Sequence, residues 1–198
     1  MPIPLPYSVV LASASPRRKQ LLKELVDDFD VVVSDVDEEV FTVADPYLTA
    51  QGLAAAKARV VFARRPDAIV IGGDTVVALP VGDGIYKQFS KPISVTDAED
   101  MLGNLSGKTH FVVTGICVVS PLGETVLTDL SKVTFRQLSK QEISEYVATG
   151  IPMDKAGGYA IQDGAEGFVT HLDGSMSNVI GLPLEKLSLL LRSIRAKK

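Results

Sequence analysis

The chain has 198 residues, of which 46% are hydrophobic and 22% are charged, a balance typical of a globular domain that forms its core without disulfides. The net charge of −4 argues against a dedicated nucleic-acid-binding protein, although a small anionic ligand needs only a few local cations. No apolar run approaches the ~20 residues of a membrane span, and residues 1–6 lack the pattern of a secretory signal. We therefore expect a cytoplasmic protein that binds neither nucleic acid nor membranes.

Strand and helix signals alternate along the first half of the chain. Short runs rich in valine and isoleucine predict strands, and leucine and alanine residues at helical spacing predict helices. In chain order we expect a strand at Val9–Ala12, a helix from Pro16 to about Leu25 with Ser15 at its N-cap, a strand at 29–34, an acidic turn at 35–39, a helix at 46–63, a strand at 68–79 and a hairpin or loop at 80–90.

The second half of the chain combines helices with a pair of long strands joined by a turn at 121–124. We expect a helix at Val95–Leu105, strands at 109–119 and 125–136, a helix from the capping box Ser139–Glu142 to about Ala148, an irregular segment around Gly157, a strand at 168–172 and a final helix at 184–194. This mixture predicts an α/β fold, with one mixed sheet and flanking helices in a single domain over residues 1–198.

The turn between the first strand and the first helix reads Ser13-Ala14-Ser15-Pro16-Arg17-Arg18. Free backbone N–H groups at a helix start, two hydroxyls and two guanidinium groups favour the binding of an anion such as phosphate. The alternative is a solvated basic turn. Arg17 and Arg18 oppose the helix dipole, however, and residues that break a local rule favour a functional interpretation.

An acidic residue interrupts the apolar strand at 68–79, within Gly72-Gly73-Asp74-Thr75. A carboxylate among apolar residues is costly to bury unless it is paired or lies beside a metal ion. The two glycines indicate a bulge or the close approach of a ligand. Asp74 is therefore a candidate metal ligand or acceptor of a proton from water, and the alternative is a turn residue between two short strands.

A second acidic group, residues 37–39, has the composition of a solvated turn. It is also a candidate for magnesium, which is commonly held by one or two carboxylates together with substrate phosphates. Basic residues isolated in the sequence are each typical of the surface when taken alone: Lys57, Lys91 and Lys155.

Three further features indicate structure rather than chemistry. The segment 103–109 resembles a Walker A loop, but it has one residue too few between its glycines and runs from helix to strand. Cys117 lies in an apolar run and predicts a buried thiol rather than a nucleophile. His110 and His171 show no metal-ligand spacing.

Several short motifs follow one another along the chain: Leu11-Ala12-Ser13-Ala14-Ser15-Pro16-Arg17-Arg18, Val36-Asp37-Glu38, Ala56-Lys57-Ala58, Gly73-Asp74-Thr75, Lys91-Pro92, Asp154-Lys155-Ala156-Gly157 with Tyr159-Ala160-Ile161-Gln162, and Gly181-Leu182-Pro183. In this order they resemble the Maf family of nucleoside triphosphate pyrophosphatases. The resemblance covers about residues 8 to 192, and the ordered set is far more specific than any one motif.

The resemblance implies a fold like that of the inosine triphosphate pyrophosphatases, with two lobes around a central cleft. It implies hydrolysis of a nucleoside triphosphate to the monophosphate and pyrophosphate, with a divalent cation such as Mg²⁺, Mn²⁺ or Co²⁺, in a family that is often dimeric. Asp74 would accept the proton of the attacking water, and Glu38 and Asp74 would hold the metal. The residues implied for phosphate binding are Ser13, Arg17, Arg18, Lys57 and Lys91.

Base preference within the family is implied by three motif positions. The branch that acts on dTTP and UTP has Arg, Thr and Gln there, which this chain matches with Arg17, Thr75 and Gln162. The amide of Gln162 offers a donor and an acceptor to the O4/N3 edge of a uracil-type base. Two alternatives remain open, namely hydrolysis of 7-methyl-GTP and a non-catalytic nucleotide sensor that regulates cell division. Modified pyrimidine nucleotides are further candidate substrates.

Overall fold

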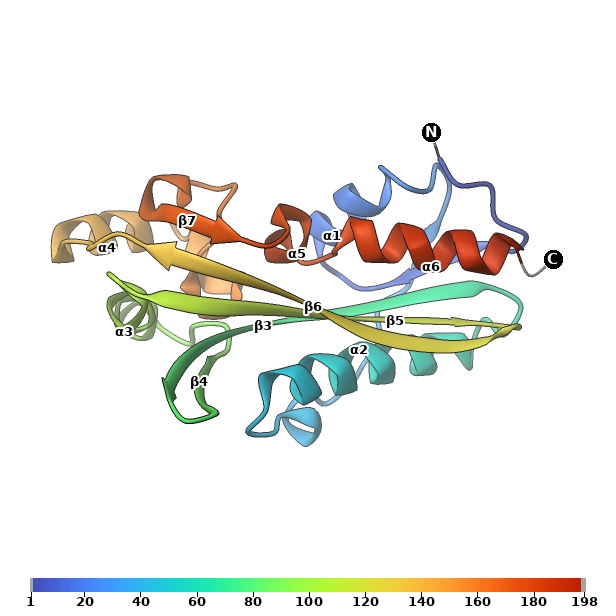
Figure 1. The fold of residues 1–198 in the computed structure, drawn as a ribbon, viewed down its shortest axis with the longest axis horizontal. Helices are drawn as coiled ribbons and strands as arrows, with labels where there is room; N and C mark the ends of the chain where they lie inside the picture. Colours follow the sequence, from blue (N-terminus) through green and yellow to red (C-terminus); the bar gives the residue numbers. More distant parts are fainter. Residues whose placement is uncertain (1, 197–198) are drawn as a thin grey trace.

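A seven-stranded sheet forms the centre of the computed structural model, which describes residues 2–196 (Figure 1). Its strands are β1 (Val9–Ala12), β2 (Asp30–Val31), β3 (Ile69–Gly82), β4 (Ile85–Phe89), β5 (Thr109–Ser120), β6 (Gly123–Phe135) and β7 (Val169–Asp173). The order across the sheet is β2-β1-β3-β5-β6-β7, and β4 pairs with β3. The pairs β1–β2 and β1–β3 are parallel and the others antiparallel, which confirms the predicted mixed α/β class.

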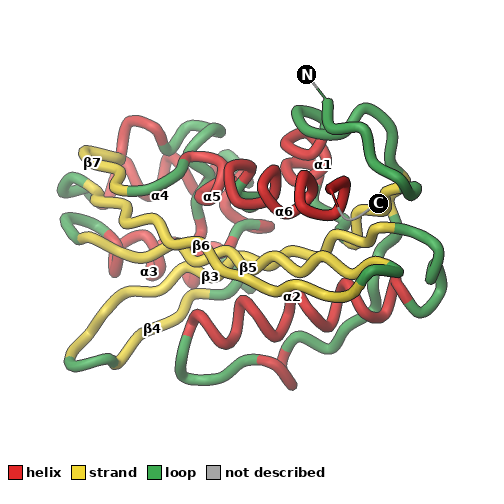
Figure 2. The backbone as a smooth tube through the Cα atoms, turned by 45° about the vertical axis from the view of Figure 1, so that its right-hand side comes forward, coloured by secondary structure: helices red, strands yellow, loops and turns green. Residues whose placement is uncertain are grey.

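Helices cover both faces of this sheet. They are α1 (Pro16–Leu22), α2 (Pro46–Phe62), α3 (Val95–Leu105), α4 (Lys140–Ala148), α5 (Met176–Ile180) and α6 (Leu184–Ala196). Short 3-10 turns are η1 (Glu39–Phe41), η2 (Ile151–Asp154), η3 (Ala156–Gly158) and η4 (Glu166–Phe168). Figure 2 shows α2 on one side of the long strands and α1 and α6 on the other.

The alternation of side chains along β1 explains how both faces become apolar. Val9 and Leu11 pack with α1 and α6, whereas Val10 and Ala12 pack with α2. Successive side chains of a strand point to opposite faces, so a continuous run of apolar residues suits a strand covered on both sides. None of the helices within residues 2–196 has the length and apolar character needed to cross a membrane.

Helix α2 lies unusually close to the sheet. A Cβ atom on Gly115 would lie 2.1 Å from the carbonyl oxygen of Ala50, and one on Gly72 would lie 2.3 Å from that of Ala54. These glycines therefore serve the contact between helix and sheet. Of the two alternatives for the glycine pair at 72 and 73, the bulge is wrong, because β3 and β5 pair there in unbroken register.

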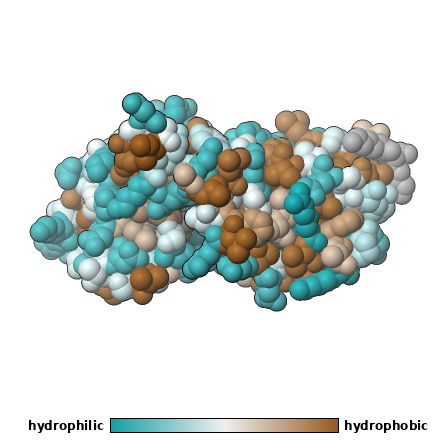
Figure 3. Space-filling view, turned by 90° about the horizontal axis from the view of Figure 1, so that it is seen from below, coloured by the Kyte–Doolittle hydropathy of each residue, from teal (hydrophilic) through white to brown (hydrophobic). Residues whose placement is uncertain are grey.

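The three long strands β3, β5 and β6 extend through two lobes (Figure 1). One lobe contains α3, α4 and β7 around an apolar cluster that includes Leu102, Phe135 and Phe168. The other contains β1, α1, α2 and α6. The outline of the molecule narrows between them in the space-filling view, where hydrophobic residues form small patches among hydrophilic ones (Figure 3).

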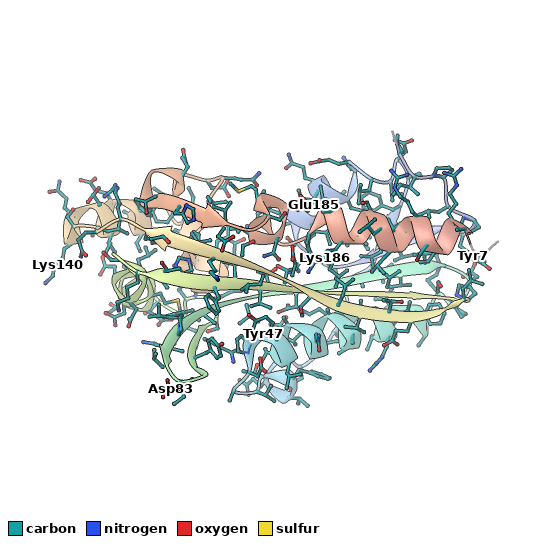
Figure 4. The ribbon with its side chains drawn as sticks, in the orientation of Figure 1. Tyr7, Tyr47, Asp83, Lys140, Glu185 and Lys186 are labelled. Atoms are coloured by element: carbon teal, nitrogen blue, oxygen red, sulfur yellow. The ribbon has the colours of Figure 1, made fainter. Side chains whose placement is uncertain are left out.

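Several predicted boundaries need correction. The strand expected at 29–34 is reduced to β2, because Val31 and Val33 are exposed at the sheet edge. The first helix ends at Leu22 rather than near Leu25. The segment 80–90 is a hairpin, with Asp83 at its tip (Figure 4). Helix α5 was not predicted, since its five residues are too few for a periodic pattern.

Two imidazoles differ completely in their surroundings. His110 is fully buried, with Nε2 2.8 Å from the hydroxyl of Tyr159 and edge-on contacts to the rings of Tyr159 and Phe135. Burial lowers the pKa of His110 to about 3. His171 on β7 is exposed. Cys117 is also buried, as predicted, and burial raises its pKa to about 12.

The buried imidazole predicts a specific loss of stability in acid. Between about pH 6.5 and pH 3 the unfolded chain binds a proton at His110 and the folded chain does not. The free energy of unfolding is therefore highest above pH 6.5 and decreases as the pH drops through this range. We expect His110→Gln to reduce the fall in unfolding free energy between pH 7 and pH 5 by about 2 kcal/mol. Urea denaturation followed by circular dichroism measures this difference.

The matched control is His171→Gln, which makes the same substitution at the exposed imidazole on β7. Carboxylates titrate equally in all three proteins, so the comparison isolates the imidazole. Equal slopes for His110→Gln and the wild type would contradict the assignment.

Candidate active site

One cavity of about 790 Å³ lies between the two lobes, within the range of small-molecule sites. It is lined by the β1–α1 turn, the loop before η1, the middle of β3, the end of β4 and the segment 154–162. Every site residue predicted from the sequence lines it: Ser13, Arg17, Arg18, Glu38, Lys57, Asp74, Thr75, Lys91 and Gln162. Segments as distant as the first and sixth motifs therefore meet in one place.

A lysine lies between two carboxylates on the cavity wall. Lys57 Nζ is 2.7 Å from Asp74 Oδ1 and 2.7 Å from Glu38 Oε1. The side chains of Lys57 and Asp74 are 12% and 13% exposed, whereas that of Glu38 is 52% exposed. Burial disfavours the charged form of Glu38, but the bond from Lys57 and the charges of Lys57 and Lys91 hold its pKa below the ordinary value.

The elements that carry these three residues explain why they meet. Asp74 is in the middle of β3, opposite Gly115 of β5, so its interpretation as a turn residue between short strands is wrong. Lys57 is on α2, one residue before Ala58, whose backbone and Cβ lie against Gly72. Glu38 precedes η1, and of the acids at 37–39 it alone lines the cavity.

Arg18 reaches from α1 across the cavity to β3 and α5. Its Nε donates to the Gly181 carbonyl at 2.8 Å, its Nη1 to Ser13 Oγ at 3.3 Å and its Nη2 to Thr75 Oγ1 at 3.0 Å. Burial and the charge of Arg17 lower the pKa of Arg18, and Asp74 opposes this shift. A guanidinium has five N–H groups, so two remain for a ligand.

The remaining cations lie around the same cavity. Lys155 is 8% exposed and pairs with Asp154, and Lys91 is exposed at the end of β4. Burial opposes ionisation of Asp154, but Lys155 and Arg17 hold its pKa below the ordinary value. Five basic and three acidic side chains line the cavity of a chain whose net charge is −4. The cavity is thus a local concentration of positive charge.

Two buried hydroxyls anchor the segment that carries Gln162. The hydroxyl of Tyr159 bonds His110, and the backbone N–H of Ala160 donates to Tyr146 Oη at 3.1 Å. Gln162 itself is exposed and lines the cavity. Its amide therefore projects from a fixed backbone and is accessible to a ligand.

Glu38 and Asp74 fit a divalent cation only in part. Their oxygens converge on one ammonium group, and magnesium is commonly held by one or two carboxylates with the rest of its ligands from substrate and water. Within the part of the chain that the structure describes, no group of three or more acidic, histidine or cysteine side chains could hold a metal by itself.

Sequence reasoning missed some residues around the cavity. The interpretation of Lys57 and Lys155 as surface charges is wrong, because both are largely buried. Thr114 and Asn178 were not singled out, although they contact the site from behind. Nothing in the sequence near Thr114 signals this role, since its partners Thr75 and Asn178 lie 39 and 64 residues away.

Comparison with known proteins agrees with this arrangement. A family model described as Maf-like protein matches residues 8–194. The chain belongs to the Maf family. A relative from Aquifex aeolicus, named dTTP/UTP pyrophosphatase, is 46% identical over 186 residues, which cover 94% of this chain and 95% of the relative.

Other Maf relatives carry the same name. One from Desulforamulus reducens is 45% identical over 93% of this chain and 95% of its own length, and one from Deinococcus radiodurans is 42% identical over 97% and 95%. The similarity therefore extends over both lobes and every motif around the cavity.

The two ion pairs of Lys57 predict how the stability of this Maf protein changes when the lysine side chain is removed. Lys57→Met leaves two carboxylates facing each other without their ammonium partner. We expect the unfolding free energy to fall by about 2 kcal/mol at pH 7, less than for a fully buried pair because Glu38 is half exposed. Millimolar MgCl₂ should raise the melting temperature of this variant more than that of the wild type.

The matched control is Arg59→Met on the same helix, which breaks an exposed ion pair with Glu124. We expect a change of less than about 0.5 kcal/mol there and no added response to MgCl₂. If MgCl₂ stabilises Lys57→Met no more than the wild type, Glu38 and Asp74 do not form a cation site.

Proposed function

We propose that this protein hydrolyses dTTP and UTP to the monophosphate and pyrophosphate. The observation that carries the proposal is the convergence of Asp74, Lys57 and Glu38 with Arg17, Thr75 and Gln162 on one cavity. The names of the Maf relatives support it, because their similarity covers nearly the whole chain. The cationic lining suits a triphosphate, and the exposed amide of Gln162 suits a base edge.

Asp74 is the proton acceptor in this proposal. Water adds at the α–β phosphoanhydride, the bond to the bridging oxygen breaks, and pyrophosphate leaves with the bonding electrons. Asp74 orients that water and takes up its proton, while the ammonium of Lys57 holds the carboxylate in place. The proposed role of Arg18, Lys57 and Lys91, which all line the cavity, is to stabilise the negative charge that develops on the leaving pyrophosphate. Ser13 accepts a hydrogen bond from Arg18 and helps to hold it.

Glu38 and Asp74 would hold a divalent cation together with substrate phosphates. A bound Mg²⁺, Mn²⁺ or Co²⁺ supplies neutralisation of phosphate charge and polarisation of the phosphoanhydride. The role left to the protein is to align the two carboxylates, which Lys57 does by contacting both.

Three broader expectations accompany the proposal. We propose that residues 1–198 act as one domain, because β3, β5 and β6 are shared by both lobes. A homodimer and a cytoplasmic location stay predictions from the sequence. Hydrolysis of 7-methyl-GTP and nucleotide binding without hydrolysis are the rival outcomes of the experiment below.

Pyrophosphate release from a panel of nucleotides with MgCl₂ tests the activity. The wild type should release pyrophosphate fastest from dTTP and UTP. Asp74→Asn, which keeps the shape of the side chain but removes the base, should fold normally and lose at least about 100-fold in kcat, the usual contribution of general-base catalysis.

Asp129→Asn is the matched control, because Asp129 also pairs with a lysine at 2.7 Å, Lys186, which extends from α6 toward the sheet outside the cavity (Figure 4). It should keep wild-type turnover. Near-normal turnover by Asp74→Asn would exclude Asp74 as the proton acceptor. Fastest release from 7-methyl-GTP, or binding without release, would overturn the proposed reaction.

Gln162→Glu tests base recognition. A carboxylate offers no donor to the O4 atom of a uracil-type base, so kcat/KM for dTTP and UTP should fall about 10-fold or more, with a smaller fall for purine nucleotides. Steady-state kinetics over the same panel measures the ratio. An equal loss on all nucleotides would contradict a role of Gln162 in recognising the base.

A further inference from the structure

A line of buried hydrogen bonds runs from the cavity wall to α5. Thr75 on β3 and Thr114 on β5 are directly opposite in register, and their Oγ1 atoms are 3.0 Å apart. The Thr114 hydroxyl donates to the carbonyl oxygen of Asn178 at 2.9 Å. Thr114 and Asn178 are fully buried and are not among the residues that line the cavity.

The direction of each bond in this line follows from hydrogen counting. A hydroxyl has one hydrogen, and that of Thr114 is given to a carbonyl, which can only accept. Between the two threonines, the donor must therefore be Thr75. Thr75 also accepts a hydrogen bond from Arg18 Nη2, which leaves its oxygen one free lone pair and no free hydrogen. Toward a ligand, the Thr75 hydroxyl can therefore only accept.

Arg18 is fixed by the same arrangement. Its Nη2 bonds Thr75 and its Nε bonds the carbonyl of Gly181, the residue that ends α5. A Cβ atom on Gly181 would lie 3.2 Å from Thr75 Oγ1, so a side chain there would crowd both partners. The orientation of the guanidinium thus depends on where α5 lies relative to β3.

Side chains of the sheet and of α6 hold α5 in that place. The Asn178 amide donates to the carbonyl of Val112 at 3.0 Å and to Ser131 Oγ at 2.8 Å. Ser131 in turn donates to the carbonyl of Ser175 at 3.0 Å. Glu185, labelled in Figure 4 near the junction of α5 and α6, accepts from the Ser175 hydroxyl at 2.9 Å.

We propose that Thr114 is a positioning residue for substrate binding. It fixes the Thr75 hydroxyl as an acceptor toward the ligand and, through Asn178, holds α5 so that Gly181 and Thr75 orient the guanidinium of Arg18. This inference rests on the proposed function, since it gives Thr75 and Arg18 a substrate to bind. A buried polar group that is fully bonded and directional specifies one arrangement, which a valine at the same position cannot do.

The test compares Thr114→Val with Thr114→Ser in dTTP hydrolysis. Thr114→Val should raise KM about 10-fold or more and lower kcat as well, because Arg18 binds the substrate and also stabilises the leaving pyrophosphate, whereas Asp74 and Lys57 keep their contacts. Thr114→Ser keeps the hydroxyl and should restore KM to within about threefold of the wild type. The matched control is Thr109→Val, which removes a similar threonine pair, with Thr134, at the exposed end of β5.

A double-mutant cycle separates positioning from a general loss of packing. If Thr114 acts through Thr75, the double variant Thr75→Val, Thr114→Val should show about the same rise in KM as Thr75→Val alone. Multiplicative effects, or an unchanged KM in Thr114→Val, would overturn the inference while leaving the proposed function standing.

The same cycle in thermal unfolding does not depend on activity. The drop in melting temperature of the double variant should be smaller than the two single drops combined, because each single change already breaks the bond between the threonines. If the wild type releases no pyrophosphate from any nucleotide, the proposed function fails. Additive drops in melting temperature would then show that the two threonines are not coupled, and the inference would fail as well.

Discussion

The backbone of α2 lies directly against strands β3 and β5, because both strands carry glycine where the helix passes. With any side chain at Gly115, a Cβ atom would lie 2.1 Å from the carbonyl oxygen of Ala50. This close approach brings Lys57 within 2.7 Å of Asp74 in the neighbouring strand. The central ion pair of the cavity therefore depends on two positions that carry no side chain at all.

The partly buried carboxylate and ammonium on the cavity wall, Asp74 and Lys57, form an ion pair. A partly buried carboxylate or ammonium without a partner costs several kcal/mol, and Asp74 and Lys57 each remove this cost from the other. Arg18 has three neutral oxygen acceptors, and Lys155 contacts Asp154. Glu38 remains half exposed, which leaves one carboxylate of the group accessible from solvent.

Gln162, a candidate for contacting the base, comes from a different part of the molecule than Asp74 and Lys57, the candidates for the chemistry. Lys57 is on α2 of one lobe and Asp74 is in the middle of the shared strand β3. Gln162 follows η3, where the buried Tyr159–His110 and Ala160–Tyr146 bonds anchor the segment to the other lobe. Arg18 connects the parts, since it contacts β3 and the end of α5 at once. The shared strands thus hold the groups proposed to bind phosphate and those proposed to bind the base in a fixed relation to one another.

The sequence by itself determined most of the helices and strands and identified which residues belong to the site. The apolar run Val9–Ala12, the Ser15 cap before Pro16 and the Ser139–Glu142 capping box all depend on residues within four positions of one another, and the structure contains each of them. The motifs also identified nine residues that line the cavity. Only the tertiary structure decided their partners. The burial of Lys57 depends on how closely α2 packs, and the bond between Thr75 and Thr114 depends on the register of β3 with β5. A contact between residues 39 positions apart follows from strand pairing, which no local pattern encodes.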